Sequence, residues 1–142
     1  MQNLFIKPND EFKVKLSVAV DQNGAIYCDV NQDFLKKSIE GITAFESCTV
    51  SDYEVVFRKP SFGDTVKLYD QIFSVSNNAS LNFNPLLARY KKISLLIKLW
   101  NITEDGSSKK PTDEEISALH PIVANALGVQ LDAETGGILN LS

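Results

Sequence analysis

Few side chains in this sequence could support catalysis, and they are not grouped along the chain. His120 is the only histidine, so a catalytic dyad, triad or metal site would have to be built around it. It directly precedes a proline. The nearby acids Asp113, Glu114 and Glu115 suit the positive end of a helix dipole, which explains them without catalysis. The spacing places no base beside a serine or cysteine nucleophile. We therefore expect that the protein is not an enzyme.

Phosphate and metal sites are not indicated either. The glycines are dispersed, and their one adjacent pair, Gly136-Gly137, does not follow a predicted strand as a phosphate-binding loop would. Cys28 and Cys48 are too few and too far apart for a metal site, and we expect both to be thiols. The sequence therefore predicts no cofactor and no bound metal ion.

Composition predicts one folded domain over residues 1–142, with 44% apolar and 23% charged residues. The net charge is −4 and the basic residues are scattered in pairs, which argues against a nucleic-acid-binding surface. The longest apolar run, ISLLIKLW, is interrupted by Lys98 and is too short to span a bilayer. The mixed N-terminus has no secretory pattern. We expect a cytoplasmic protein that binds neither nucleic acid nor membrane.

The elements of the N-terminal half follow from alternation and turn residues. Residues 12–20, FKVKLSVAV, alternate as a half-buried strand, and Asn23-Gly24 suits a tight turn, so we predict a β-hairpin over 12–30 with Cys28 in the core. Apolar residues of 31–46 recur at helical spacing, although Gly41 weakens that helix. A further strand over 53–58 ends before Pro60, which cannot donate to a ladder.

Helices dominate the prediction for the C-terminal half. Ser61 and Asp64 have the spacing of a capping box, followed by the stripe Phe62, Val66, Tyr69 and Phe73. A surface loop over 74–82 precedes Asn84-Pro85, a strong helix start. The central helix that follows carries the stripe Leu86, Tyr90, Ile93, Ile97 and Trp100 on one face.

The last predicted helical segment begins with a second capping box, Thr112 with Glu115. It should kink or restart at His120, before Pro121, and end near Leu127-Gly128. The fold is therefore expected to be α+β, with the hairpin and one further strand packed against three to four helices. We expect a β-rich part over 1–60, a helical part over 61–130, and a tail over 131–142 that is flexible unless another chain receives it.

The aromatic stripes have two interpretations. They are core residues, or part of them stays exposed for a partner. On the second interpretation the candidate partner-binding residues are Arg58, Lys59, Phe62, Tyr69, Phe73, Tyr90, Ile97 and Trp100. If Arg58, Lys59 and Pro60 do not form a site, they form a corner between a strand and a helix.

Two stretches resemble small morphogenesis proteins of tailed bacteriophages. FRKPSFGD, 57–64, looks like the strand, Arg-x-Pro-Thr/Ser-x-Gly-Asp, helix opening of many phage tail assembly chaperones. LLIKLWNITEDGSSKKPTDEEISALHPIVANAL, 95–127, is similar to their apolar helix ending in Trp and Asn, their acidic turn and their Pro-Thr-x-Glu helix start. The matches fall within 53–127, about half of the chain, and the N-terminal hairpin lies outside them.

The resemblance implies non-catalytic work during assembly. Tail assembly chaperones hold the long tape measure protein while tail tube subunits polymerise around it, which requires apolar surfaces that cover a partner's helices. On this reading the partners are tape measure, tube or baseplate proteins, and the protein acts in the host cytoplasm. The alternative is a small structural component of the baseplate, neck or tail that stays in the virion. A third reading is an enzyme or regulatory domain of unrelated origin, and self-association is left open.

Overall fold

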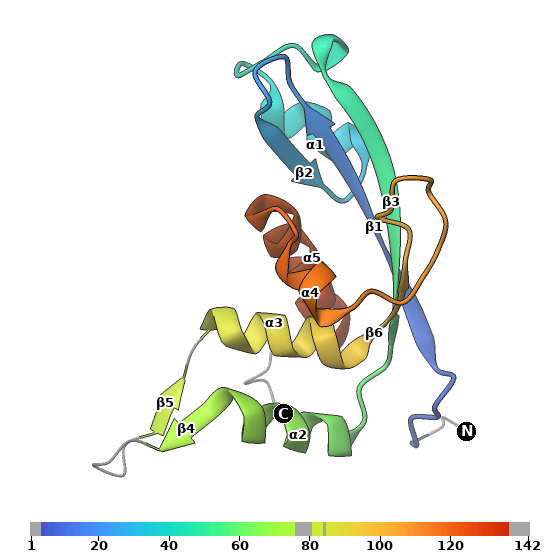
Figure 1. Ribbon diagram of the computed structural model, residues 1–142, viewed down its shortest axis with the longest axis vertical. Helices are drawn as coiled ribbons and strands as arrows, with labels where there is room; N and C mark the ends of the chain where they lie inside the picture. The colour runs from blue at the N-terminus through green and yellow to red at the C-terminus, as the bar shows by residue number, and fades with distance from the viewer. Residues whose placement is uncertain (1–3, 76–80, 84, 137–142) are drawn as a thin grey trace.

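The computed structural model of the protein describes residues 4–75, 81–83 and 85–136 (Figure 1). These residues form an α+β fold, which confirms the predicted class. An antiparallel sheet has the strand order β2-β1-β3-β6, comprising β1 Glu11–Val20, β2 Ile26–Asp29, β3 Thr49–Arg58 and β6 Ile97–Trp100. A separate antiparallel ribbon pairs β4, Phe73–Val75, with β5, Leu81–Phe83.

Helices lie on both faces of the sheet and below it (Figure 1). They are α1 Gln32–Ile39, α2 Phe62–Ile72, α3 Pro85–Leu96, α4 Asp113–Ser117 and α5 Pro121–Thr135, with a 3₁₀ turn at Phe45–Ser47. The predicted β-rich part over 1–60 contains β1, β2 and β3, and the predicted helical part over 61–130 contains α2, α3, α4 and the first part of α5. Helix α1 lies within the first range, and strands β4, β5 and β6 lie within the second.

The predicted hairpin over 12–30 is confirmed as β1 and β2. Gly24 has a φ of +84°, the left-handed conformation that glycine adopts without a steric penalty. The Asp21 carboxylate accepts hydrogen bonds from the backbone N–H groups of Asn23 and Ala25, each at 2.9 Å, and so fixes the turn. This turn sets the register that carries Val14, Leu16 and Val18 to the inner face.

Strand β1 is covered on one face along its length and on both faces near its end. The face with Val14 and Leu16 packs with Val55 and Phe57 of β3 in the main core, which α3 and α5 close. On the other face, Ala19 packs against α1 in a second cluster. The half-buried prediction therefore holds only for the first part of the strand, because α1 folds back over the rest.

The central helix is shorter than predicted. Helix α3 ends at Leu96, and Ile97–Trp100 form β6, which pairs with β3 in the register Val55↔Trp100 and Phe57↔Ile97. The prediction failed because Ile97 and Trp100, three positions apart, can share a buried face either in a helix or in a strand that contains a bulge. The register shift between Val56 and Phe57 is that bulge, and it turns both Ile97 and Trp100 toward the core.

Helix α2 starts where predicted but buries a different face. Its buried residues are Asp64, Leu68 and Ile72, whereas Phe62 is 85% exposed and Val66 is 53% exposed. The predicted stripe of Phe62, Val66, Tyr69 and Phe73 is therefore not the packing face. Phe73 lies in β4 rather than in the helix, and its side chain falls outside the described residues.

Helix α1 and the segment after α2 also differ from the prediction over 31–46 and 74–82. Helix α1 stops at Ile39, because Gly41 takes a φ of +82° and turns the chain away. Part of the predicted loop over 74–82 forms β4 and β5, while 76–80 lie outside the described residues. Helix α3 begins at Pro85 as predicted, and Asn84 also lies outside the described residues.

The C-terminal helices confirm both predicted start signals. Thr112 and Glu115 form a capping box at α4, and the chain restarts at His120, whose Nδ1 accepts a hydrogen bond from the N–H of Ile122 at 3.2 Å. The predicted end at Leu127-Gly128 is wrong, because α5 continues to Thr135. That helix takes in the first five residues of the predicted tail, 131–142, and 137–142 lie outside the described residues.

Gly128 is explained by packing rather than by helix termination. A Cβ atom at this position would lie 2.2 Å from Cδ of Arg89, which crosses α5 there. The Arg89 guanidinium continues to Asn125 and Asp132 of the same helix. Glycine therefore lets α3 and α5 approach closely, which offsets its low helix propensity.

The burial of α2 is testable with two substitutions on the same helix. Leu68, 4% exposed, points into the fold, so Leu68→Ala should lower the free energy of unfolding by about 2–5 kcal/mol through lost contacts and a cavity. Val66→Ala should change it by about 0.5 kcal/mol or less. Urea unfolding followed by circular dichroism measures both, and a Val66→Ala loss as large as that of Leu68→Ala would contradict this orientation.

Candidate functional site

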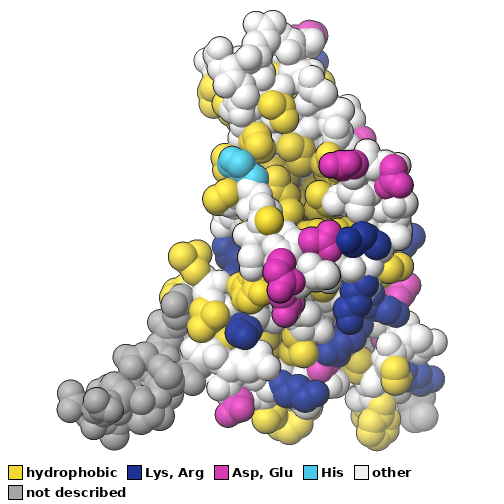
Figure 2. Space-filling view, in the orientation of Figure 1, with side chains coloured by type: hydrophobic (Ala, Val, Ile, Leu, Met, Phe, Trp, Pro, Cys, Tyr) yellow, Lys and Arg dark blue, Asp and Glu magenta, His cyan; other side chains and the backbone are white. Residues whose placement is uncertain are grey.

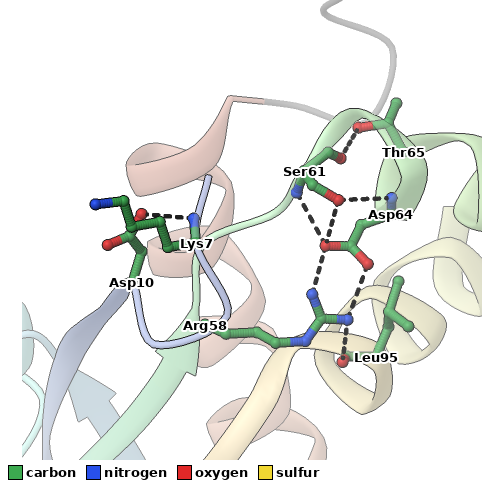
Figure 3. A network of polar contacts seen from close by, with 7 residues as sticks. All are labelled: Lys7, Asp10, Arg58, Ser61, Asp64, Thr65 and Leu95. Carbon is green, nitrogen blue, oxygen red and sulfur yellow. Dashed lines mark hydrogen bonds and ion pairs between the residues drawn. The ribbon is translucent and has the colours of Figure 1, made fainter. Parts of the chain in front are cut away.

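The corner after β3 is built around an ion pair between Arg58 and Asp64 (Figure 3). The Arg58 guanidinium engages both oxygens of the Asp64 carboxylate, with Nη2 donating to Oδ1 at 2.9 Å and Nη1 donating to Oδ2. Nη2 also donates to the main-chain oxygen of Leu95 at 3.2 Å. One arginine at the end of β3 thus joins the first turn of α2 to the last turn of α3.

The sequence produces this corner through local backbone rules. Pro60 cannot donate to a ladder and stops β3. The N–H of Lys59 donates to the main-chain oxygen of Asp10 at 2.9 Å. This hydrogen bond holds the N-terminal segment beside the corner. The N–H of Ser61 donates to Asp64 Oδ2 at 2.9 Å, and the N–H of Asp64 donates to Ser61 Oγ at 3.2 Å. The predicted capping box is therefore present, with aspartate as the shorter partner.

The electrostatics of the corner favour a structural role. The hydrogen bond from Arg58 lowers the pKa of Asp64 below its usual value, against the opposing effect of burial. Asp64 thus stays ionised near neutral pH and has no proton to give. Arg58 already donates to the Asp64 carboxylate and to the Leu95 main-chain oxygen, so an anionic ligand could bind it only by breaking these contacts. We call the Arg58–Asp64 ion pair the Arg58–Asp64 lock. We conclude that this pair orients α2 rather than performing chemistry.

The other residues predicted for partner binding are divided between surface and core. Lys59 and Phe62 are exposed beside the corner. Tyr69, further along α2, is half-buried. Tyr90 is half-buried against the main core, and its hydroxyl donates to the main-chain oxygen of Asp113 at 3.5 Å.

Ile97 and Trp100 correct the prediction for the central stripe. Both are buried in the main core, at 4% and 2% exposure, because β6 pairs with β3 and turns them inward. In the folded chain they offer no surface to a partner. Among the residues of the predicted stripe, Leu86 is well exposed, and it lies in the first turn of α3.

A buried lysine also has a structural explanation. Lys92 of α3 is 4% exposed, and its Nζ donates to Asp132 Oδ1 and to the Gly136 oxygen, each at 2.8 Å. The ammonium therefore fixes the end of α5, where helix carbonyl groups lack partners of their own. Sequence reasoning missed this residue, because a lysine between apolar neighbours at helical spacing gives no sign of which partner it meets.

His120 and Cys28 both have surroundings that explain them structurally. His120 is exposed, and its Nδ1 caps α5. Burial raises the pKa of the Cys28 thiol to about 11, which keeps it protonated and weakly nucleophilic near neutral pH. Within the residues that the structure describes, no three His, Cys, Asp or Glu side chains gather closely enough to hold a metal ion.

Two surface hollows are large enough to receive a small ligand. One of about 530 Å³ lies between α1 and the 3₁₀ turn and is lined by side chains of both charge signs, including Lys36, Lys37 and Glu40. The other, of about 360 Å³, includes Asp52, whose carboxylate already accepts from Ser17 Oγ at 2.6 Å and Gln32 Nε2 at 2.9 Å. Neither hollow presents converging groups that would orient a substrate.

Exposed apolar residues lie on the N-terminal segment and on α2, and the sequence analysis identified only some of them. Leu4 and Phe5 of the N-terminal segment are 87% and 79% exposed, and Phe62 and Val66 stand out from α2. Figure 2 shows hydrophobic side chains along the lower edge, where Figure 1 places α2 and the N-terminal segment. The signal was an apolar Leu4-Phe5-Ile6 run before Pro8 that belongs to no alternating strand.

Comparisons with protein-family models, curated proteins and solved structures find no match to this chain. Among the described helices, none combines the length and the apolar character needed to cross a bilayer.

The Arg58–Asp64 lock predicts a pH-dependent stability difference. Because the pKa of Asp64 is lowered by folding, its contribution is complete well above the usual aspartate pKa of about 3.9 and is lost as pH falls through the folded value. Asp64→Asn should therefore cost about 2 kcal/mol of unfolding free energy at neutral pH. The difference in unfolding free energy between Asp64→Asn and the native protein should shrink below about pH 4.

Urea unfolding across pH measures this gap. Asp70→Asn is the matched control, because Asp70 is an exposed carboxylate on the same helix. A gap for Asp64→Asn that stays constant with pH would show that the carboxylate charge is not what the lock uses.

Proposed function

We propose that this chain is a non-enzymatic bacteriophage tail morphogenesis protein of the tail assembly chaperone type. The observation that carries a binding role is the orientation of α2. The Arg58–Asp64 lock holds Leu68 and Ile72 inward, which leaves Phe62 and Val66 exposed to a partner. Exposed apolar residues that a locked helix cannot turn inward are typical of an interaction surface.

The class of process comes from the resemblance of 57–64 and 95–127 to tail assembly chaperones. Four residues of the first stretch, Arg58, Pro60, Ser61 and Asp64, build the corner that aims α2. The second stretch spans the passage from α3 into β6 and then α4 and the first half of α5. Both stretches therefore serve the placement of the α2–α3 hairpin, which presents the exposed apolar side chains.

The proposed mechanism needs no reaction and no cofactor. The apolar side chains of α2 cover helices of a tape measure, tail tube or baseplate protein until assembly proceeds, and the surface is small enough to be released. The work takes place in the host cytoplasm. Neither nucleic acid nor membrane takes part in this mechanism.

The alternative function is a small structural component of the baseplate, neck or tail. It is favoured by the N-terminal hairpin and α1, which lie outside the resembling segments and form a second apolar cluster around Ala19, Leu35 and Ile39. A part that stays in the particle would use such an addition for permanent docking. Both functions use the exposed apolar end of the molecule.

Mass spectrometry separates the two functions. In cells infected by the phage that encodes this chain, a chaperone should co-purify with tail proteins during assembly and be absent from purified mature particles. Deletion of its gene should leave heads without complete tails. Stoichiometric presence in particles would defeat the chaperone and support the structural component, and normal tails without the protein would defeat both.

A further inference from the structure

The exposed apolar end of the molecule also carries a local positive charge. Leu4 in the N-terminal segment and Phe62 and Val66 of α2 are exposed there, and the Lys59–Asp10 main-chain hydrogen bond ties the two segments together. Lys59, between β3 and α2, and Lys67 of α2 are also exposed. We call these four residues, Lys59, Phe62, Val66 and Lys67, the basic apolar surface.

The charge balance of this end differs from that of the whole chain. Lys7, Lys59 and Lys67 stand against Asp10 and Asp70, while Arg58 and Asp64 cancel within their lock. These residues together carry one net positive charge, although the chain has a net charge of −4. Among the described residues, Lys59 and Lys67 have no carboxylate within ion-pair distance. Their charges are available to a partner.

We propose that the basic apolar surface binds an amphipathic helix whose apolar stripe is flanked by Asp or Glu residues. The proposal rests on the proposed function and names the chemistry of its partner. Phe62 and Val66, one helical turn apart, supply a ridge against which a second helix packs. Lys59 precedes Phe62 by three residues and Lys67 directly follows Val66, so acidic residues beside the partner's stripe meet opposite charge and basic ones meet repulsion.

A protein helix fits this surface better than a lipid bilayer does. Basic sites for anionic lipid gather about four to eight Lys or Arg residues in one place. Here two exposed lysines lie near the ridge residues in the sequence, and the net negative charge of the chain opposes adsorption to an anionic plane. A helix contacts only a narrow strip of the surface. The negative charges elsewhere on the chain are screened from this strip, because screening acts over about 10 Å.

The test uses the full chain and two labelled synthetic helices of about 18 residues, or five turns. Both peptides carry the same leucine stripe, and the flanking positions are Glu in one and Lys in the other. Fluorescence anisotropy should show the Glu peptide binding at least about tenfold more tightly, with an affinity that falls as salt rises. Equal binding of the two peptides would overturn the proposal, and so would binding to vesicles of phosphatidylserine without binding to the Glu peptide.

Matched variants locate the binding. Phe62→Ser and the double variant Lys59→Glu with Lys67→Glu should each weaken binding of the Glu peptide about tenfold or more. Phe34→Ser and the double variant Lys36→Glu with Lys110→Glu change exposed residues elsewhere, with Phe34 at 52% exposure, and should bind as the native chain does. Unchanged binding in the first pair of variants would overturn the assignment of the surface.

Circular dichroism of each variant establishes that it is folded, and a further measurement separates this proposal from the proposed function. If Phe62→Ser abolishes co-purification with tail proteins while the peptides bind without a charge preference, the tail role stands and the acidic partner is wrong. If the Glu peptide binds as expected and no tail protein co-purifies, the partner chemistry stands and the proposed function is wrong.

Discussion

The Arg58–Asp64 ion pair is the constraint on which the lower half of the structure depends. A partly buried ion pair adds little net stability, because desolvation offsets most of its attraction, but it has strict geometry. Here the geometry fixes the rotation of α2 about its axis. Leu68 and Ile72 follow Asp64 at intervals of four residues, so the direction of one carboxylate decides which side chains of the helix are buried. The same contact holds the end of α3 through the Leu95 carbonyl group.

A second polar contact fixes α3 from its other side. Lys92 binds Asp132 and the Gly136 oxygen, and Arg89 lies across Gly128 of α5. Helix α3 therefore has two basic side chains, Arg89 and Lys92, directed at α5, while the guanidinium of Arg58 reaches its last turn from β3. The apolar core supplies the bulk of the stabilisation, and these charged groups select one arrangement of the helices from the many that apolar packing alone would tolerate.

Sequence reasoning was most accurate where a structure depends on neighbouring residues. The hairpin at Asn23-Gly24, the stop at Pro60 and the capping box of Thr112 follow from local backbone chemistry and were predictable. The orientation of α2 was not, because it depends on an arginine in another element. The strand at Ile97–Trp100 was also missed, since its pairing with β3 joins residues forty or more positions apart, which no local pattern indicates. For the candidate site, the sequence identified Lys59 and Phe62, but it could not separate them from the buried Ile97 and Trp100.

The direct passage from α3 into β6, without an intervening loop, has a mechanical consequence. Leu96 ends the helix and Ile97 begins the strand, so the helix axis is joined to the edge of the sheet through a single peptide unit. The twelve residues of α3 extend about 18 Å from that point, at about 1.5 Å per residue, toward the β4–β5 ribbon in Figure 1. Helix α3 is thus a lever with its fulcrum at the sheet. A tilt of about 10° would displace its far end by about 3 Å, given this length. Because Arg89 and Lys92 hold α3 against α5, a load applied at the ribbon is shared between those contacts and β6, where Trp100 lies against the core.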